Sequence, residues 1–93
     1  MNRWPFDQPP KANAITTRPV LELRETVRVV IHFGDDHSWA FLCGTTDEVT
    51  DGRVMTMEQA MLQDISLLEL ADLPAGWTAR RPAKGADWVR SRS

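Results

Sequence analysis

The sequence predicts a single α+β domain: a small, mostly antiparallel β-sheet with one or two helices packed on one face. Three observations support this prediction. The chain has 93 residues, which suits one domain. Two runs rich in β-branched and aromatic residues flank the turn sequence GDDH, a pattern typical of a hairpin. A later run of apolar residues at helical spacing follows a capping sequence.

Residues 1–13 are predicted to form an extended segment, because they hold three of the six prolines. Proline fixes φ and has no N–H to donate, so this segment suits neither a helix nor a central strand. Trp4 and Phe6 lie within it, and aromatic rings are costly to leave in water. We expect them to dock the segment onto the domain. The alternative is an exposed aromatic anchor for a partner.

The domain itself is expected over residues 14–90, starting with a short strand at residues 14–17. The sequence RPVLELRE then predicts a short helix. Thr17 is placed to cap this helix, and Pro19 lies near its start, where a missing N–H does no harm.

Residues 27–33 and 38–43 are predicted to pair as the central hairpin. Opposing Phe33 to Ser38 places His32 opposite Trp39. Because side chains alternate between the two faces of a strand, both faces of this hairpin are largely apolar. We therefore expect both faces to be covered, one by a helix and part of the other by the N-terminal segment.

The second half of the domain is expected to begin with a strand at residues 53–56. Thr56 and Gln59 form a capping box that opens a helix over residues 57–70. Asp64 could restart this helix, so one bent helix and two short ones are both possible. Pro74 and Gly76 are stop signals. The sequences WTARRP and DWVR predict a last pair of strands, and residues 91–93 are expected to be a disordered tail.

Cysteine usage and the N-terminal sequence bear on the compartment. One cysteine excludes an internal disulfide framework, which favours a reducing cytoplasm. The N-terminus has no apolar core of a signal peptide, and no stretch approaches the roughly 20 apolar residues needed to span a membrane. We expect a cytoplasmic protein that acts away from the membrane.

Charge is distributed unevenly along the chain. Residues 34–72 hold nine acidic residues and one basic residue, whereas both ends are mildly basic. The two regions could pair on folding, or the acidic middle could form a surface that attracts a basic protein and repels nucleic acid. The candidate partner-binding residues are Asp35, Asp36, Trp39, Asp47, Glu48 and Asp51.

The sequence HFGDDHSWAFLCG holds both histidines and the cysteine. His32 and Cys43 are predicted to share a face, but four strand positions separate them by roughly 13 Å. One metal ion cannot bind both, and His37 is expected in the turn, away from both. There is also no G-x-S-x-G, P-loop or G-x-G-x-x-G motif. We therefore expect no metal, no cofactor and no enzymatic activity. An alternative function is a small-molecule sensing module with a pocket near His32 and Trp39.

The sequences ITTRPVLE, DDHSWAFLCG and DISLLELADLPAGWTARR resemble a family of small bacterial proteins of unknown function. That family is grouped with the immunity proteins of polymorphic toxin systems. It often has Asp-Ser-Gly before the tryptophan, where this chain has Asp36, His37 and Ser38. The resemblance implies a single α+β domain without enzymatic activity that blocks a toxin by protein contact. The matching positions are Val20, Leu21, Asp36, Trp39, Phe41 and Gly44.

Overall fold

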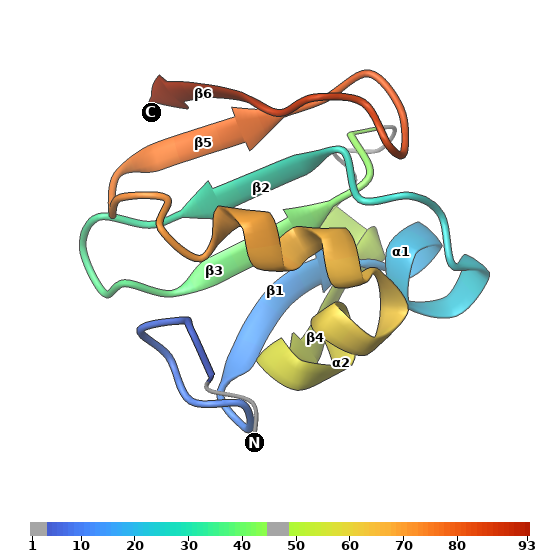
Figure 1. The fold of residues 1–93 in the computed structure, drawn as a ribbon. Coiled ribbons are helices and arrows are strands. Elements are labelled where there is room, and N and C mark those ends of the chain that lie inside the picture. Colours follow the sequence, from blue (N-terminus) through green and yellow to red (C-terminus); the bar gives the residue numbers. More distant parts are fainter. Residues whose placement is uncertain (1–3, 45–48) are drawn as a thin grey trace.

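A computed structural model of the chain describes residues 4–44 and 49–93. These residues form a six-stranded sheet in the order β4-β1-β3-β2-β5-β6 (Figure 1). The α+β class is confirmed, but the sheet is mixed, because β1 runs parallel to β3. The strands are β1 (Asn13–Thr17), β2 (Val29–His32), β3 (Trp39–Leu42), β4 (Gly52–Thr56), β5 (Trp77–Arg80) and β6 (Val89–Arg92).

The central hairpin has the predicted register. His32 lies opposite Trp39, and the N–H of Phe33 donates to the carbonyl of Ser38 over 2.9 Å. The paired strands are shorter than the expected ranges. They are central because β1 flanks β3 and β5 flanks β2.

Helical elements cover one face of the sheet (Figure 1). They are α1 (Arg18–Leu23), α2 (Met57–Gln63) and the 3-10 helix η2 (Ile65–Leu70), and a further 3-10 turn, η1 (Val49–Asp51), precedes β4. One or two helices were expected on this face, whereas the described residues form three. The predicted alternative of two short helices after β4 is correct.

Caps explain where these helices begin. At α2 both bonds of the capping box are formed. The N–H of Gln59 donates to Thr56 Oγ1 over 3.2 Å, and the N–H of Thr56 donates to Gln59 Oε1 over 2.8 Å. Asp64 ends α2 and caps η2 by accepting from the N–H of Ser66. Thr17 stands at the cap position of α1, but its side chain makes no capping hydrogen bond.

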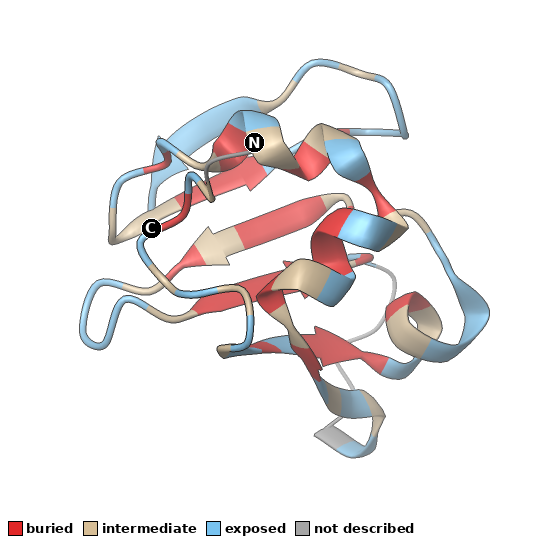
Figure 2. Cartoon of the chain, turned by 60° about the horizontal axis from the view of Figure 1, so that its bottom comes forward, coloured by how far each residue is buried: buried red, intermediate tan, exposed pale blue. Residues whose placement is uncertain are grey.

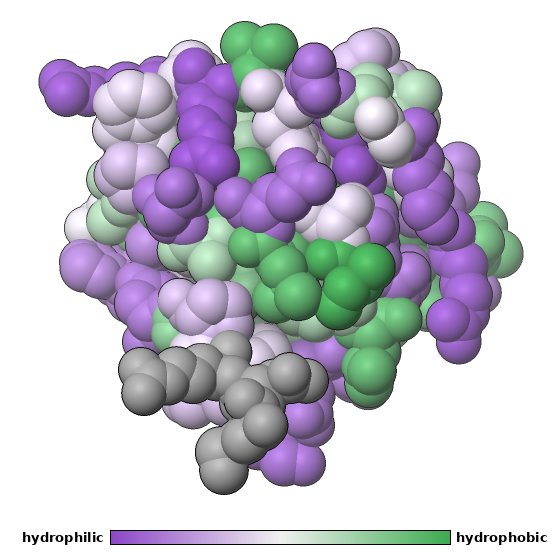
Figure 3. Space-filling model, viewed as in Figure 1, coloured by the Kyte–Doolittle hydropathy of each residue, from purple (hydrophilic) through white to green (hydrophobic). Residues whose placement is uncertain are grey.

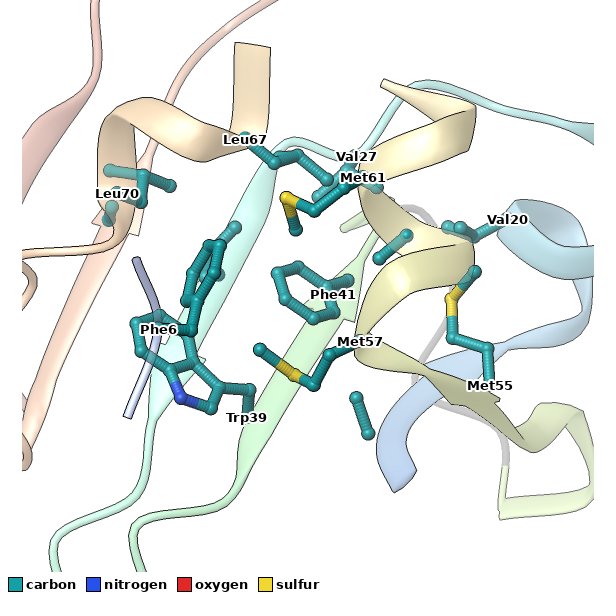
Figure 4. Packing of buried hydrophobic residues seen from close by; sticks show 14 of the residues in the cluster. Phe6, Val20, Val27, Trp39, Phe41, Met55, Met57, Met61, Leu67 and Leu70 are labelled. Atoms are coloured by element: carbon teal, nitrogen blue, oxygen red, sulfur yellow. The ribbon is translucent and has the colours of Figure 1, made fainter. Parts of the chain in front are cut away.

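The core lies between the sheet and these helices (Figure 4). Trp39 and Phe41 on β3 are fully buried, and buried residues concentrate in the central strands (Figure 2). Phe6 of the N-terminal segment belongs to this cluster, with its ring edge-on to Trp39 at 5.0 Å. The segment is therefore docked as predicted, but on the helix side. The expectation that it covers the opposite face is wrong, because Phe6 reaches the ring of Trp39 on the helix side.

The C-terminal residues continue the sheet. Ser91 and Arg92 lie in β6, and the N–H of Ser93 donates to the carbonyl of Gly76 over 2.8 Å. The predicted disordered tail is wrong, because backbone pairing to β5 orders residues whose side chains are exposed. In the described parts of the chain, no helix has both the length and the apolar character to cross a membrane.

Candidate functional site

The described members of the predicted acidic set lie at different ends of the sheet. Asp35 and Asp36 lie in the turn between β2 and β3. Asp51 precedes Gly52, which pairs with Thr17 at the opposite end of the strands. Asp47 and Glu48 lie outside the described residues.

The described acids have local structural partners. One Asp36 carboxylate oxygen accepts from the N–H and the hydroxyl of Ser38, at 3.0 and 2.7 Å. These bonds hold the pKa of Asp36 below its usual value. Asp51 lies 3.8 Å from Arg18. Trp39 has no exposed surface, so it cannot contact a partner directly in this conformation.

Within residues 4–44 and 49–93, one face of the sheet carries no helix, and we call it the open face. Register places one row of its side chains across all six strands, and a second row lies beside it. The helices and the N-terminal segment pack on the other side. The open face consists of Val54, Ile15, Ala40, Ile31, Thr78, Ser91, Leu42, Val29, Arg80 and Val89.

The open face is aliphatic and nearly uncharged. Ile15 is 47% exposed, Val54 59% and Val89 68%. Arg80 is its one charged residue. Val29 and Ala40 are buried, but they do not belong to the core cluster, which lies on the helix side of the sheet. The prediction that both faces of the hairpin are apolar is therefore correct, although no helix of the described residues covers this one.

The helix side contains a second feature, built around His32 at the end of β2. His32 is buried, and its ring stacks on Trp39 with 4.0 Å between centroids. Its Nδ1 lies 2.7 Å from the carbonyl oxygen of Leu73. A carbonyl oxygen only accepts, so Nδ1 carries a hydrogen. The other nitrogen, Nε2, lies 2.9 Å from Oδ2 of Asp7.

Asp7 and His37 complete this cluster, which we call the Asp-His-His cluster. The Oδ1 of Asp7 accepts from the indole N–H of Trp39 over 2.9 Å, and its Oδ2 lies 3.5 Å from Nδ1 of His37. Burial acts to raise the pKa of Asp7, but the Trp39 hydrogen bond and the two histidines outweigh it, so the pKa is lowered.

The expectation that His37 lies away from His32 is wrong, because their ring centroids are 5.8 Å apart. His37 has φ of 62°, a left-handed conformation in which histidine is enriched among non-glycine residues. The side chain of Gln8 also donates to the His37 carbonyl over 3.1 Å. Sequence reasoning missed Asp7 altogether. The only signal was the expected docking of Phe6, its neighbour.

Around His32 and Trp39, where a pocket is expected from the sequence, the described residues pack closely. Both rings are buried, and Phe6 and Asp7 lie against them. Hollows occur elsewhere. One of about 410 Å³ lies beyond the end of α1, lined by Leu23, Arg24, Glu25, Thr26, Arg28, Cys43, Pro82 and Ala83.

The chain matches no family model, no curated protein and no solved structure.

Proposed function

We propose that this chain is a non-enzymatic protein-binding module that docks a partner on the open face. The supporting observation is the exposure of Ile15, Val54 and Val89 on one nearly uncharged side of the sheet. A sheet with one face in water normally carries polar side chains on that face. Exposed apolar surface, in contrast, marks interaction sites. Here it lies toward the two edges of the face, at Ile15 and Val54 and at Val89.

The chemistry of the open face favours a partner that differs from this chain. Such a partner presents an aliphatic surface, with a carboxylate placed to meet the exposed guanidinium of Arg80. A second copy offers no acidic residue from its own open face, so Arg80 would stay unpaired in a face-to-face dimer. The acids Asp35 and Asp36, exposed in the turn at one end of the sheet, belong to the rim. Rim charges steer association more than they add affinity.

This proposal keeps the immunity-type function that the resemblance implies and moves its contact surface. An inhibitor of that kind acts by covering its target, so it needs a stable, complementary surface and no catalytic group. The acidic surface proposed from the sequence is replaced by the open face, with Asp35 and Asp36 at its edge.

The helix side offers a matched control surface. Apolar surface also gathers there over α2 and η2 (Figure 3). Leu62 is 86% exposed and Ile65 is 70% exposed. Substitutions at these two residues change apolar surface on the side away from the open face.

The test compares three baits in lysate of the source organism: the native chain, Ile15→Lys/Val54→Lys, and Leu62→Lys/Ile65→Lys. Thermal melts first establish that all three are folded. A protein captured by the native chain is then purified, and its Kd for each bait is measured by calorimetry. We expect at least a tenfold weaker Kd for the open-face variant, about 1.4 kcal/mol, and an unchanged Kd for the control.

Equal Kd values for the native chain and the open-face variant would contradict the surface assignment. Self-association of the native chain that Ile15→Lys/Val54→Lys abolishes, measured by sedimentation, would replace the partner protein with a second copy. Capture of no protein by any bait would contradict the proposed function.

A further inference from the structure

We propose that Asp7, His32 and His37 form a binding site for a divalent first-row transition-metal ion, with zinc as the test ion. This proposal is independent of the open face, because the three residues lie on the helix side. It rests on the convergence of their donor atoms, the placement of hydrogens and the support behind each side chain.

Three segments bring the donor atoms together. Asp7 comes from the N-terminal segment, His32 from the end of β2, and His37 from the turn before β3. One ligand atom from each residue lies within 4.8 Å of the other two. The carboxylate Oδ2 of Asp7 is shared, at 2.9 Å from His32 Nε2 and 3.5 Å from His37 Nδ1.

The hydrogen on Nδ1 of His32 makes a positive charge favourable between Nε2 of His32 and Oδ2 of Asp7. Because His32 Nδ1 donates to the carbonyl of Leu73, a neutral ring directs the lone pair of Nε2 at Asp7. A lone pair and a carboxylate oxygen at 2.9 Å repel each other unless a cation or a second ring proton lies between them. A metal ion coordinated by both atoms provides this charge, and so does an imidazolium. The experiment below separates the two.

His32 and Asp7 each make the second hydrogen bond that metal ligands usually make. Ligating histidines commonly donate their second N–H to a carbonyl, which fixes the tautomer and the ring orientation. His32 does this with Leu73. Ligating carboxylates are commonly hydrogen-bonded as well, and Asp7 uses its other oxygen to accept from Trp39. Both arrangements leave Nε2 of His32 and Oδ2 of Asp7 for the ion.

The separations suit a tetrahedral ion. With bonds of about 2.0–2.1 Å, neighbouring ligand atoms of tetrahedral zinc lie about 3.3 Å apart. The separations of 2.9 and 3.5 Å from Oδ2 of Asp7 to the two histidine nitrogens bracket that value. The two histidine nitrogens lie within 4.8 Å of each other, so the exposed His37 side chain moves toward His32 when the ion binds. The side chain of His32 is 6% exposed, whereas those of Asp7 and His37 are 39% and 56% exposed. The ion therefore has a path of entry and keeps a vertex for water.

The donor set selects the class of metal. Two imidazoles and one carboxylate suit zinc and its first-row neighbours, whereas calcium and magnesium prefer oxygen ligands alone. Cys43 is not part of the set, so no thiolate biases the site toward softer ions.

Binding would tie the N-terminal segment to the sheet. Asp7 is the only ligand from that segment, and Phe6 beside it packs on Trp39. An ion that binds the folded chain alone raises the melting temperature through mass action. For a domain of this size, a free zinc concentration of one hundred times Kd raises Tm by about 10–20 °C.

The test measures zinc affinity by competition with a chromophoric chelator for four proteins: the native chain, Asp7→Asn, His37→Asn and the control Asp35→Asn. Asparagine tolerates the left-handed conformation of His37 and removes its imidazole. Asp35→Asn makes the same chemical change as Asp7→Asn in the exposed turn, at a residue outside the set of converging donors. Since loss of outer-shell support alone costs about 10–100-fold in affinity, we expect at least about 100-fold weaker binding in Asp7→Asn and His37→Asn.

Cobalt provides a second readout that does not depend on folding stability. Bound at this site, Co²⁺ should show the intense visible d–d bands of tetrahedral coordination and quench Trp39, whose ring stacks on His32. Nitrogen NMR in excess zinc should show His32 carrying a proton at Nδ1 alone. A native chain that binds no zinc, equal affinity in all four proteins, or a doubly protonated His32 in excess zinc would each overturn the proposal.

Discussion

Arg81 and Asp64 form a buried ion pair that joins the end of β5 to the junction between α2 and η2. Nη2 of Arg81 lies 2.7 Å from Oδ2 of Asp64, with the two side chains 1% and 8% exposed. Arg81 also donates to the carbonyl of Val27 and stacks its guanidinium over Trp88 at 4.2 Å. Asp64 accepts in addition from Ser66. Each guanidinium nitrogen and both carboxylate oxygens therefore have a hydrogen-bond partner, the condition under which a buried ion pair is tolerated.

Arg81→Ala should be strongly destabilising. It leaves the carboxylate of Asp64 buried without its cation, which costs about 3–5 kcal/mol of unfolding free energy. Denaturant unfolding at neutral pH measures this loss. The control is Arg90→Ala, which breaks a more exposed pair with Asp72 at 2.8 Å and should cost far less, because solvent screens that pair. Similar losses in both variants would contradict the role given to Arg81.

The same pair should make stability depend on acid pH. Burial acts to raise the pKa of Asp64, but the hydrogen bonds from Ser66 and Arg81 and the charge of Arg81 lower it below 3.8. A lowered folded-state pKa contributes stability above the unfolded value, and that contribution is lost as the pH falls through the folded value. The free energy of unfolding should therefore decline below about pH 5. Asp64→Asn should show a shallower decline, and an unchanged slope would contradict the assignment.

Phe6→Ala should undock the N-terminal segment. The ring is 7% exposed and packs on Trp39, so its loss should cost about 2–4 kcal/mol of unfolding free energy. Trp39 should then emit at longer wavelength, and proteases should cleave within residues 4–12 sooner. Thermal melts and limited proteolysis check both effects. A variant with native stability and native cleavage would show that the segment is not part of the core.

The aliphatic residues of the open face should contribute little to stability. Ile15→Thr/Val54→Thr keeps β-branched side chains on exposed strand positions, so the unfolding free energy should change by about 0.5 kcal/mol or less per site. The fluorescence of a dye that binds apolar surface should fall in this variant. A loss of several kcal/mol would mean that these side chains are needed for folding.

Local patterns in the sequence were sufficient for much of the fold. The register of His32 against Trp39 follows from the turn and from alternation, and the cap at Thr56 follows from a four-residue motif. The parallel pairing of β1 with β3 could not be predicted in this way. Its paired residues, such as Thr16 and Phe41, are 25 residues apart in the sequence, and no local motif indicates that they meet. Ser91 was wrongly assigned to a disordered tail for the same reason, because the residue types there do not show that the backbone pairs with β5.

The Asp-His-His cluster also depends on contacts between distant parts of the chain. The predicted register placed His32 opposite Trp39 and on the same face as Cys43. The distance that matters, however, is the one between His32 and Asp7, and it was not considered. His37 reaches His32 through a left-handed backbone conformation, and Asp7 arrives from a proline-rich segment. The apolar character of both hairpin faces was predicted correctly. An apolar pattern alone, however, does not distinguish a face covered by the chain itself from a face left exposed.

The measurement that tests the central claim most directly is the solvent exposure of methyl groups in the free protein. Methyl NMR with a soluble paramagnetic probe reports this exposure residue by residue. If the open face is bare, the methyl signals of Ile15 and Val54 should broaden as strongly as that of the exposed Leu62, while that of the buried Leu67 stays sharp. Protection of Ile15 and Val54 to the level of Leu67 would show that this face is covered in the free chain, and would contradict its assignment as the docking surface.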